Sequence, residues 1–223
     1  KRIRISSIEA SQITDKVIDV LNSSDKMCRH LHIPLQAGDD RVLQRMRRKY
    51  TTAEYGAKIE KIYRAMPDVA ITTDVIVGFP GETDEMFRNG YKFIEQMRFA
   101  EMHVFPFSKR NGTPAARMED QLDEQVKHER VHELIDLSER MQLQYAQRFV
   151  GDVLDVIPER TYKGAPDGGL VMGYSDNYLQ IVFPGDPGMI GELCRVKVTE
   201  AGANECRGEL VRILDEPVPA ANG

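Results

Sequence analysis

Residues 71–82 read ITTDVIVGFPGE, and they combine a strand pattern, a glycine turn and a helix start. The first seven residues are mostly β-branched, with Asp74 as the only charge, which predicts an interior strand of a parallel sheet. The next residues, GFPG, predict a sharp turn at the carboxyl end of that strand, and Thr83 or Glu82 can cap the following helix. Ligands of open α/β sheets and barrels bind at this end, although a turn shaped for geometry alone would have the same composition.

The composition narrows the classes of function. A chain of 223 residues has room for one large domain or two modest ones. Its net charge of -5 argues against binding nucleic acid through overall charge, so any RNA contact must be local. Cys28, Cys194 and Cys206 are an odd count without a short-spaced pair, which predicts reduced thiols and no metal site built on cysteine. No apolar run is long enough to cross a bilayer, and we expect a cytoplasmic protein.

Strand and helix patterns alternate through the first two thirds of the chain. Strand patterns at 3–8, 30–35, 71–77 and 102–107 alternate with helix patterns at 13–21, 42–46, 52–66 and 87–97. Four βα repeats of this size favour an α/β fold with a parallel sheet, curved or closed into a barrel, and helices outside. A long charged helix is predicted from 123 to about 149, with an apolar stripe that packs on the sheet or bridges two domains.

Polar residues follow the predicted strands at the ends that would converge on one mouth of a barrel. They are Glu9, Gln36, and the loops 78–82 and 108–113, which suit a small polar ligand. His30 and His32 alternate with apolar residues, and one of them is expected to be a satisfied interior imidazole. No Ser-His-Asp or paired-carboxylate pattern stands out, so the sequence gives little support to hydrolytic catalysis.

Two basic clusters are candidates for phosphate contact. Arg45, Arg47, Arg48 and Lys49 precede Tyr50, and Lys109-Arg110 forms a basic turn near the predicted mouth. A solvated helix end, where the helix dipole favours cations, is the alternative explanation of the first cluster.

After residue 150 the sequence changes to short strand patterns at 153–157, 170–174, 178–183, 193–198 and 208–213. Turn-rich links join them, which predicts a small antiparallel β-barrel of the oligonucleotide-binding type. Tyr174, Tyr178 and Phe183 could stack on bases, with Arg195, Lys197 and Arg212 near phosphates. The alternative is that the aromatic rings fill the barrel core, which we expect for Phe183. Residues 215–223 are expected to be disordered.

Four segments together resemble a known family. They are RIRISSIEAS (2–11), RHLHIPLQAGDDRVLQRMRRKYT (29–51), TTDVIVGFPGET (72–83) and HVFPFSKRNGTPAARM (103–118). With the barrel pattern behind them, they resemble the carboxyl-terminal half of the radical S-adenosylmethionine (SAM) methylthiotransferases. The stretches 7–10 and 109–110 are similar to the branch that acts on threonylcarbamoyladenosine next to the tRNA anticodon.

The resemblance implies a domain organisation and cofactors. It implies a partial radical SAM βα barrel at 1–149, a TRAM-like RNA-binding β-barrel at 150–215 and a tail at 216–223. The family uses S-adenosylmethionine and 4Fe-4S clusters to add a methylthio group to carbon 2 of the adenosine. The family's CxxxCxxC cluster motif is absent from this chain, which begins at Lys1 without methionine. We therefore expect a piece of a longer enzyme that is inactive by itself and holds neither catalytic residues nor metal ligands.

The resemblance also implies site residues. Gln36 would contact the ribose or methionine part of S-adenosylmethionine. The segment 76–78 would contact one side of the adenine through backbone and apolar atoms, and Phe105 with Phe107 would close the other side. The expected cofactor contacts are Gln36, Ile76, Val77, Gly78, Phe105 and Phe107, with Glu9 and Ser7 at the preceding strand end. The expected contacts to the tRNA anticodon arm are Arg45, Arg47, Arg48, Lys49, Lys109, Arg110, Tyr174, Tyr178 and Arg195.

Three alternatives stay open from the sequence. The chain could belong to the isopentenyl-adenosine branch, or it could be a non-catalytic RNA-binding protein that displays the small barrel. A third hypothesis is that the chain is an unrelated α/β enzyme, but such an enzyme needs catalytic groups that the sequence does not offer. A cut barrel would expose a sheet edge, so a homodimer formed by edge pairing is a further hypothesis.

Overall fold

The computed structural model describes residues 2–163 and 169–214, so the predicted disordered tail lies outside the described residues. The chain divides into two compact units, Lys1–Tyr145 and Ala146–Gly223.

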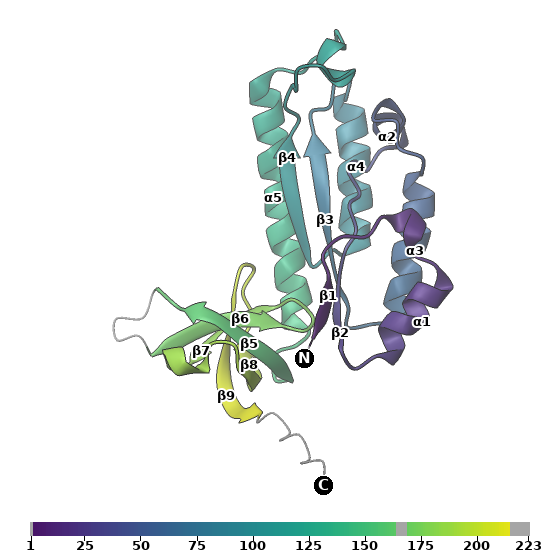
Figure 1. Cartoon of the computed structure of the whole chain (residues 1–223). Helices are drawn as coiled ribbons and strands as arrows, with labels where there is room; N and C mark the ends of the chain where they lie inside the picture. The colour runs from purple at the N-terminus through teal and green to yellow at the C-terminus, as the bar shows by residue number, and fades with distance from the viewer. Residues whose placement is uncertain (1, 164–168, 215–223) are drawn as a thin grey trace. The chain divides into compact units, whose positions relative to one another are not determined.

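The first unit is a four-stranded parallel sheet with helices along the chain between its strands (Figure 1). The strand order is β1-β2-β3-β4, with β1 at Ile3–Ile5, β2 at Met27–His32, β3 at Ala70–Val77 and β4 at Glu101–Pro106. The α-helices are α1 (Asp15–Ser23), α2 (Asp40–Arg45), α3 (Thr52–Ala65), α4 (Asp84–Met97) and α5 (Glu124–Gln147). Two 3₁₀ turns, η1 (Ala10–Gln12) and η2 (Ala115–Arg117), complete the unit. Across the described residues, no helix combines the length and the apolar character needed to span a bilayer.

One face of the sheet carries the core of this unit. Along β3, Ile71, Val75 and Val77 are buried in a cluster that includes apolar residues of α3, α4 and α5. Because side chains alternate along a strand, Thr72, Asp74 and Ile76 point to the opposite face. Asp74 and Ile76 are only partly buried there. The sheet therefore has an apolar face under the helices and a second face that is more polar.

Two elements differ from their predicted bounds. β2 ends at His32 rather than at residue 35, because Pro34 has no backbone N–H to donate to a neighbouring strand. Pairing resumes at Gln36 through an isolated parallel bridge to Val75. β1 ends at Ile5, so Ile8 lies outside the strand. The strands β1 and β4 form the edges of this sheet, and edge pairing between two copies stays a prediction.

The second unit is a closed five-stranded barrel, as expected for an oligonucleotide-binding type of fold. Its strands are β5 (Val153–Thr161), β6 (Leu170–Ser175), β7 (Gln180–Pro184), β8 (Leu193–Glu200) and β9 (Cys206–Leu214), in the order β5-β6-β7-β9-β8, with η3 at Pro187–Met189. One pair of this barrel departs from the predicted antiparallel pattern: β7 and β9 are parallel. β8 forms a hairpin with β9, so β9 returns beside β7 in the same direction.

The three cysteines do not pair. Cys28 lies on β2, whereas Cys194 and Cys206 lie in the barrel, and all three are free and buried. Burial raises the pKa of the Cys194 and Cys206 thiols. These thiols are therefore held in their protonated, less reactive form.

Candidate functional site

The predicted turn after β3 is present, and two glycines shape it. Gly78 and Gly81 have φ angles of 69° and 81°, which an L side chain adopts only with strain. Thr83 caps α4 by accepting a hydrogen bond from Met86 N at 3.2 Å, as predicted. The turn is also tied to residue 120, because Gly81 N donates to Asp120 O at 2.8 Å.

A buried carboxylate occupies the inside of this turn. Glu82 Oε1 accepts a hydrogen bond from Gly78 N at 3.0 Å and ion-pairs with Arg130 of α5 at 2.6 Å. Both side chains are only 5% exposed. Burial raises the pKa of Glu82, and the Gly78 amide and the Arg130 charge oppose that shift. The Gly78 amide is thus used within the chain, which makes this turn a support for the site.

Replacing Gly78 by alanine tests how tightly this turn is built. A Cβ at Gly78 would lie 2.2 Å from Lys127 Cγ, in addition to the strain of the positive φ angle. We expect Gly78→Ala to lower the free energy of unfolding by about 3 kcal/mol. Gly112→Ala is the matched control, because Gly112 has a φ of 86° but nothing within 4 Å of its added Cβ.

The control should cost only about 1 kcal/mol, the strain of the backbone angle alone. Urea unfolding of both variants measures the difference. Equal losses in the two variants would show that the contact with Lys127 does not constrain the turn.

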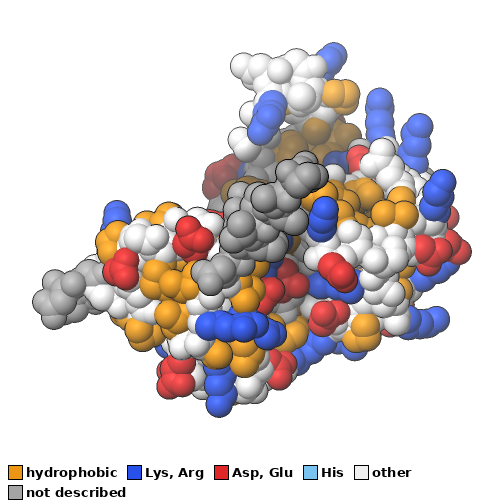
Figure 2. Space-filling model, turned by 60° about the horizontal axis from the view of Figure 1, so that its bottom comes forward, with side chains coloured by type: hydrophobic (Ala, Val, Ile, Leu, Met, Phe, Trp, Pro, Cys, Tyr) orange, Lys and Arg blue, Asp and Glu red, His pale blue; other side chains and the backbone are white. Residues whose placement is uncertain are grey.

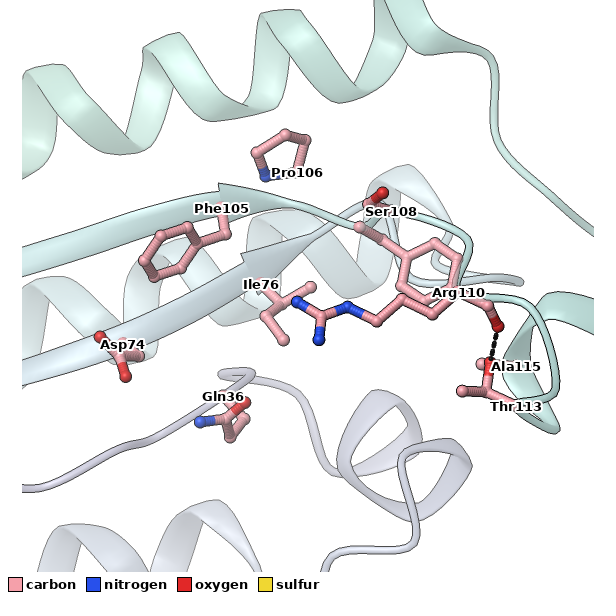
Figure 3. A pocket seen from close by; sticks show the side chains of 10 residues that line it. Gln36, Asp74, Ile76, Phe105, Pro106, Ser108, Arg110, Thr113 and Ala115 are labelled. Atoms are coloured by element: carbon pink, nitrogen blue, oxygen red, sulfur yellow. Dashed lines mark hydrogen bonds between the residues drawn. The ribbon is translucent and has the colours of Figure 1, made fainter.

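A cavity of about 540 Å³ opens beside this turn, at the carboxyl ends of β3 and β4 (Figure 3). Its lining residues are Gln36, Asp74, Ile76, Phe105, Pro106, Phe107, Ser108, Arg110, Thr113 and Ala115. In Figure 3 the Arg110 side chain extends from the loop after β4 toward Ile76 and Gln36. Phe105 is 50% exposed, and Phe107 packs edge-on against Phe79 with ring centroids 5.2 Å apart. The cavity thus combines apolar walls with one amide, one carboxylate, one guanidinium and the hydroxyl residues Ser108 and Thr113.

The backbone at Gln36 is held in an unusual conformation. Its φ angle is 72°, although it is not glycine. Gln36 N donates to Asp74 O and Ile76 N donates to Gln36 O, both at 2.8 Å, so the bridge to β3 fixes this conformation. Strained residues of this kind cluster at ligand sites because the surrounding structure compensates for their cost.

The structure brings four of the expected cofactor residues together and separates the rest. Gln36, Ile76, Phe105 and Phe107 line the cavity, but Val77 and Gly78 do not. The Val77 side chain is buried in the core under the helices, and its carbonyl accepts a hydrogen bond from Phe107 N. Ser7 is exposed and does not line this cavity.

A second cavity of about 490 Å³ collects most of the first basic cluster. It is lined by Glu9, Ala10, Ser11, Arg47, Arg48, Lys49, Tyr50, Glu54, Tyr55 and Lys58. Glu9 therefore lies with the cations and apart from the other expected cofactor contacts. Arg45 is elsewhere: it donates to Pro80 O at 2.8 Å and pairs with Asp120, so its charge supports the turn after β3.

The two histidines of β2 have different surroundings. His30 is buried and its Nε2 lies 3.0 Å from Thr72 Oγ1, which confirms the prediction of one interior imidazole. Burial, with smaller effects of Arg4 and His32, lowers the pKa of His30 to about 3. His32 lies 3.0 Å from the same hydroxyl and 3.2 Å from Asp74 Oδ2.

In the barrel, Tyr174 and Tyr178 stack on each other with ring centroids 4.9 Å apart. Both are partly buried, and the Tyr174 hydroxyl donates to Gln180 Oε1 at 2.8 Å. Phe183 is fully buried, as expected for a core residue. Arg195 pairs with Asp155 across β5 and β8 at 3.4 Å.

The surface charges are mixed. Figure 2 shows Lys and Arg side chains interspersed with Asp and Glu on the visible face. This distribution agrees with the net charge of -5 and leaves local clusters as the way to bind a polyanion. Lys109 and Arg110 are both exposed, but only Arg110 lines the cavity beside the turn.

Sequence reasoning missed several residues of this region. Arg130 and Lys127 of α5 support the turn, and Asp74 and His103 lie on the polar face of the sheet. The sequence did contain a sign of the roles of Lys127 and Arg130. Both are charged residues on the apolar stripe of α5, which continues through Leu134 and Leu137. For Asp74, the signal was a single charge in an otherwise apolar strand.

Comparison with known proteins agrees with this geometry. Residues 1–94 match the model of the radical SAM superfamily, and residues 147–211 match the model of the TRAM domain. A solved radical SAM enzyme, coproporphyrinogen III oxidase from Escherichia coli, shares the fold with a TM-score of 0.53 and 17% identity. That match covers 88% of this chain and 46% of the other.

Curated relatives are closer in sequence. Over 98% of the chain, identity is 53% with the threonylcarbamoyladenosine tRNA methylthiotransferase MtaB of Bacillus subtilis, of which 48% is covered. Identity is 40% over 96% of the chain with a tRNA-2-methylthio-N(6)-dimethylallyladenosine synthase of Thermoanaerobacter sp., of which 45% is covered. The chain thus spans about half the length of the curated relatives it matches. Residues 1–94 and 147–211 thus match a radical SAM and a TRAM domain, and nearly the whole chain is similar to radical SAM tRNA methylthiotransferases, with higher identity to the relative named for threonylcarbamoyladenosine than to the one named for dimethylallyladenosine.

Proposed function

We propose that this chain is part of an enzyme that adds a methylthio group to carbon 2 of N6-threonylcarbamoyladenosine, next to the anticodon of tRNA. The observation that carries the proposal is the 53% identity over 98% of the chain to a relative named for that nucleoside. The relative named for dimethylallyladenosine is 40% identical, which favours the first substrate. Because the proposed substrate is tRNA, we expect the enzyme to act in the cytoplasm.

The cavity beside the β3 turn is the proposed nucleoside site for S-adenosylmethionine. Its volume of about 540 Å³ lies within the range of small-molecule sites, roughly 300–1,000 Å³. Apolar contact from Ile76, Phe105 and Phe107 suits an adenine ring, and Gln36 offers an amide for a ribose or an amino-acid group. When bound in the longer protein, S-adenosylmethionine and a 4Fe-4S cluster supply the radical chemistry.

The chain's own cysteines do not fit an iron-sulfur cluster. They are buried, and they are divided between the two units, with Cys28 in the first and Cys194 and Cys206 in the second. Cluster binding needs several thiolates around one site. The proposed role of this chain is therefore to hold the nucleoside and the RNA, and we expect no catalysis from residues 1–223 alone.

Exposed cations near the two cavities are the proposed RNA contacts. We expect residues 1–223 to bind the anticodon arm with an affinity that falls steeply as salt rises, because each phosphate contact releases counterions. Removing Arg47, Arg48 and Lys49 together should reduce the slope of log K against log salt by about 2. Fluorescence anisotropy with a labelled anticodon stem-loop at several salt concentrations measures the slope.

The matched control removes three exposed cations that line neither cavity, Lys16, Arg64 and Lys92, which lie on α1, α3 and α4. The net charge of the two triple variants is then equal, so a change confined to the first variant reports position rather than charge. An affinity that stays constant between low and high salt would contradict the proposed phosphate contacts.

Nucleoside analysis of tRNA tests the proposed activity. The gene upstream of the codon for Lys1 would be sequenced, and the full encoded protein would be produced in bacteria that lack methylthiolation of threonylcarbamoyladenosine. Liquid chromatography and mass spectrometry should then detect 2-methylthio-N6-threonylcarbamoyladenosine. A methylthio product found only on dimethylallyladenosine would overturn the branch. Absence of any methylthio product, with no CxxxCxxC motif upstream, would leave RNA binding by the barrel as the function.

A further inference from the structure

Three polar side chains meet on the face of the sheet that is not covered by the core. His32, Asp74 and His103 come from β2, β3 and β4, which are neighbouring parallel strands. Asp74 and His103 are directly paired in register, and His32 is paired with Thr72. Since Thr72 and Asp74 are two residues apart on β3, their side chains share one face. The register of three strands therefore places these side chains together.

The donor atoms lie close to the separations that a small ion requires. One donor atom from each residue can be chosen so that all three lie within 4.8 Å of one another. His32 Nε2 and Asp74 Oδ2 are 3.2 Å apart, and the two imidazole ring centroids are 6.0 Å apart. Ligand bonds of about 2.1 Å limit donor separations to about 4.2 Å, so closing on an ion requires side-chain shifts on the order of 1 Å.

A second layer of hydrogen bonds orients His32. Its Nδ1 lies 3.0 Å from Thr72 Oγ1, and the same hydroxyl lies 3.0 Å from Nε2 of the buried His30. In one arrangement, His32 Nδ1–H donates to the hydroxyl and the hydroxyl donates to His30, which leaves the lone pair of His32 Nε2 facing Asp74. This orientation of a metal-ligating imidazole by its other nitrogen is common in metal sites.

The donor set selects a class of ion. Two imidazoles and one carboxylate suit Zn²⁺, Fe²⁺ or Co²⁺, whereas Mg²⁺ and Ca²⁺ prefer oxygen donors alone. The side chains of His32, Asp74 and His103 are 15%, 30% and 45% exposed, so the group is accessible from one side. With three protein ligands, positions on the ion stay open for water or another molecule. Asp74 also lines the cavity shown in Figure 3, so the open positions border that cavity.

We propose that His32, Asp74 and His103 bind one divalent transition-metal ion of the Zn²⁺, Fe²⁺ or Co²⁺ class, with open coordination positions beside the nucleoside cavity. This inference does not depend on the proposed methylthio transfer, because it rests only on side chains within residues 2–163. A metal ion needs several His, Cys, Asp or Glu donor atoms close together. Among the described residues, His32, Asp74 and His103 form the one group of three or more such side chains that meets this condition.

Cobalt titration of the 223-residue chain tests the site. One equivalent of Co²⁺ should produce visible d–d absorption without a thiolate charge-transfer band, and Zn²⁺ should displace it. His103→Ala removes a ligand and Asp74→Asn replaces the charged carboxylate with a neutral amide oxygen, and each should weaken Co²⁺ binding at least about 100-fold. Thr72→Val keeps all three ligands but removes the hydrogen bond to His32, and should weaken binding about 10-fold.

A second histidine pair provides the control. His128 and His132 lie one turn apart on α5, exposed, with their Nε2 atoms 2.8 Å apart. The double variant His128→Ala/His132→Ala should leave Co²⁺ affinity unchanged. Binding that is lost in this control, or that survives both His103→Ala and Asp74→Asn, would overturn the proposal. Circular dichroism without metal checks that the variants fold. If His103→Ala does not fold, the Co²⁺ affinity of Asp74→Asn decides the outcome.

Discussion

Arg130→Met is expected to lower the free energy of unfolding by about 3–5 kcal/mol, because it leaves the Glu82 carboxylate buried without its partner. The two side chains pair at 2.6 Å, and both are 5% exposed. Arg130 also donates to the backbone oxygen of Glu82 at 3.1 Å, so the variant loses a support of the helix start as well as the charge. Urea unfolding monitored by circular dichroism measures the loss.

The pH dependence of that loss identifies its cause. Burial already raises the pKa of Glu82, and without Arg130 the pKa should rise further. A carboxyl group whose folded pKa exceeds its unfolded pKa costs stability as pH rises above the unfolded value. The defect of Arg130→Met should therefore be smaller near pH 5 than near pH 8. The double variant Glu82→Gln/Arg130→Met removes the buried charge, and it should be more stable than Arg130→Met alone.

A matched ion pair nearby supplies the control. Arg88 of α4 pairs with Glu133 of α5, and the guanidinium groups of Arg88 and Arg130 each lie 5.1 Å from the Phe87 ring centroid. The Arg88 and Glu133 side chains are exposed, however, and an exposed pair contributes at most about 1 kcal/mol. If Arg88→Met costs as much as Arg130→Met, burial of the Glu82 carboxylate is not the source of the effect.

Local chemistry explains which parts of the fold could be predicted from the sequence. The β-branched run before Gly78, the positive φ angles at Gly78 and Gly81, and the Thr83 cap all depend on neighbouring residues, and all are present. The pairing of Glu82 with Arg130 joins residues 48 positions apart, so no local pattern contains it. A charge on the apolar stripe of α5 was the available signal, but it does not name the partner.

Strand register explains what the sequence could not supply at the site. Gln36 could be placed at one end of a parallel sheet because it follows a strand pattern, whereas Ile76 and Phe105 were expected at the site from the family resemblance. The pairing of Asp74 with His103 depends on the alignment of β3 with β4 to a single residue. A shift by one residue would turn His103 to the other face, and strand patterns do not fix bounds that closely. The parallel pairing of β7 with β9 was missed because it depends on the order of strands in the closed barrel.

Gly38→Ala is expected to destabilise the first unit by roughly 3 kcal/mol, because an added Cβ would collide with backbone. It would lie 2.7 Å from Gly90 O and 2.8 Å from Gly90 Cα, and the backbone of α4 cannot turn aside as a side chain can. The loop would have to move away from α4, two residues after Gln36. We therefore expect this variant also to weaken binding of S-adenosylhomocysteine, measured by calorimetry.

The partner glycine gives the opposite expectation, although it belongs to the same contact. A Cβ on Gly90 would lie 3.5 Å from the nearest atoms of Gly38, which is an ordinary van der Waals distance. Since Gly90 lies inside α4, alanine there should stabilise the helix by up to about 1 kcal/mol. If Gly38→Ala lowers the free energy of unfolding and Gly90→Ala raises it, the contact is limited by the direction of the Cα–Cβ bond at residue 38. Destabilisation by both variants to the same extent would instead mean that the two backbones are too close for any Cβ, and that α4 sets the position of the Gln36 loop.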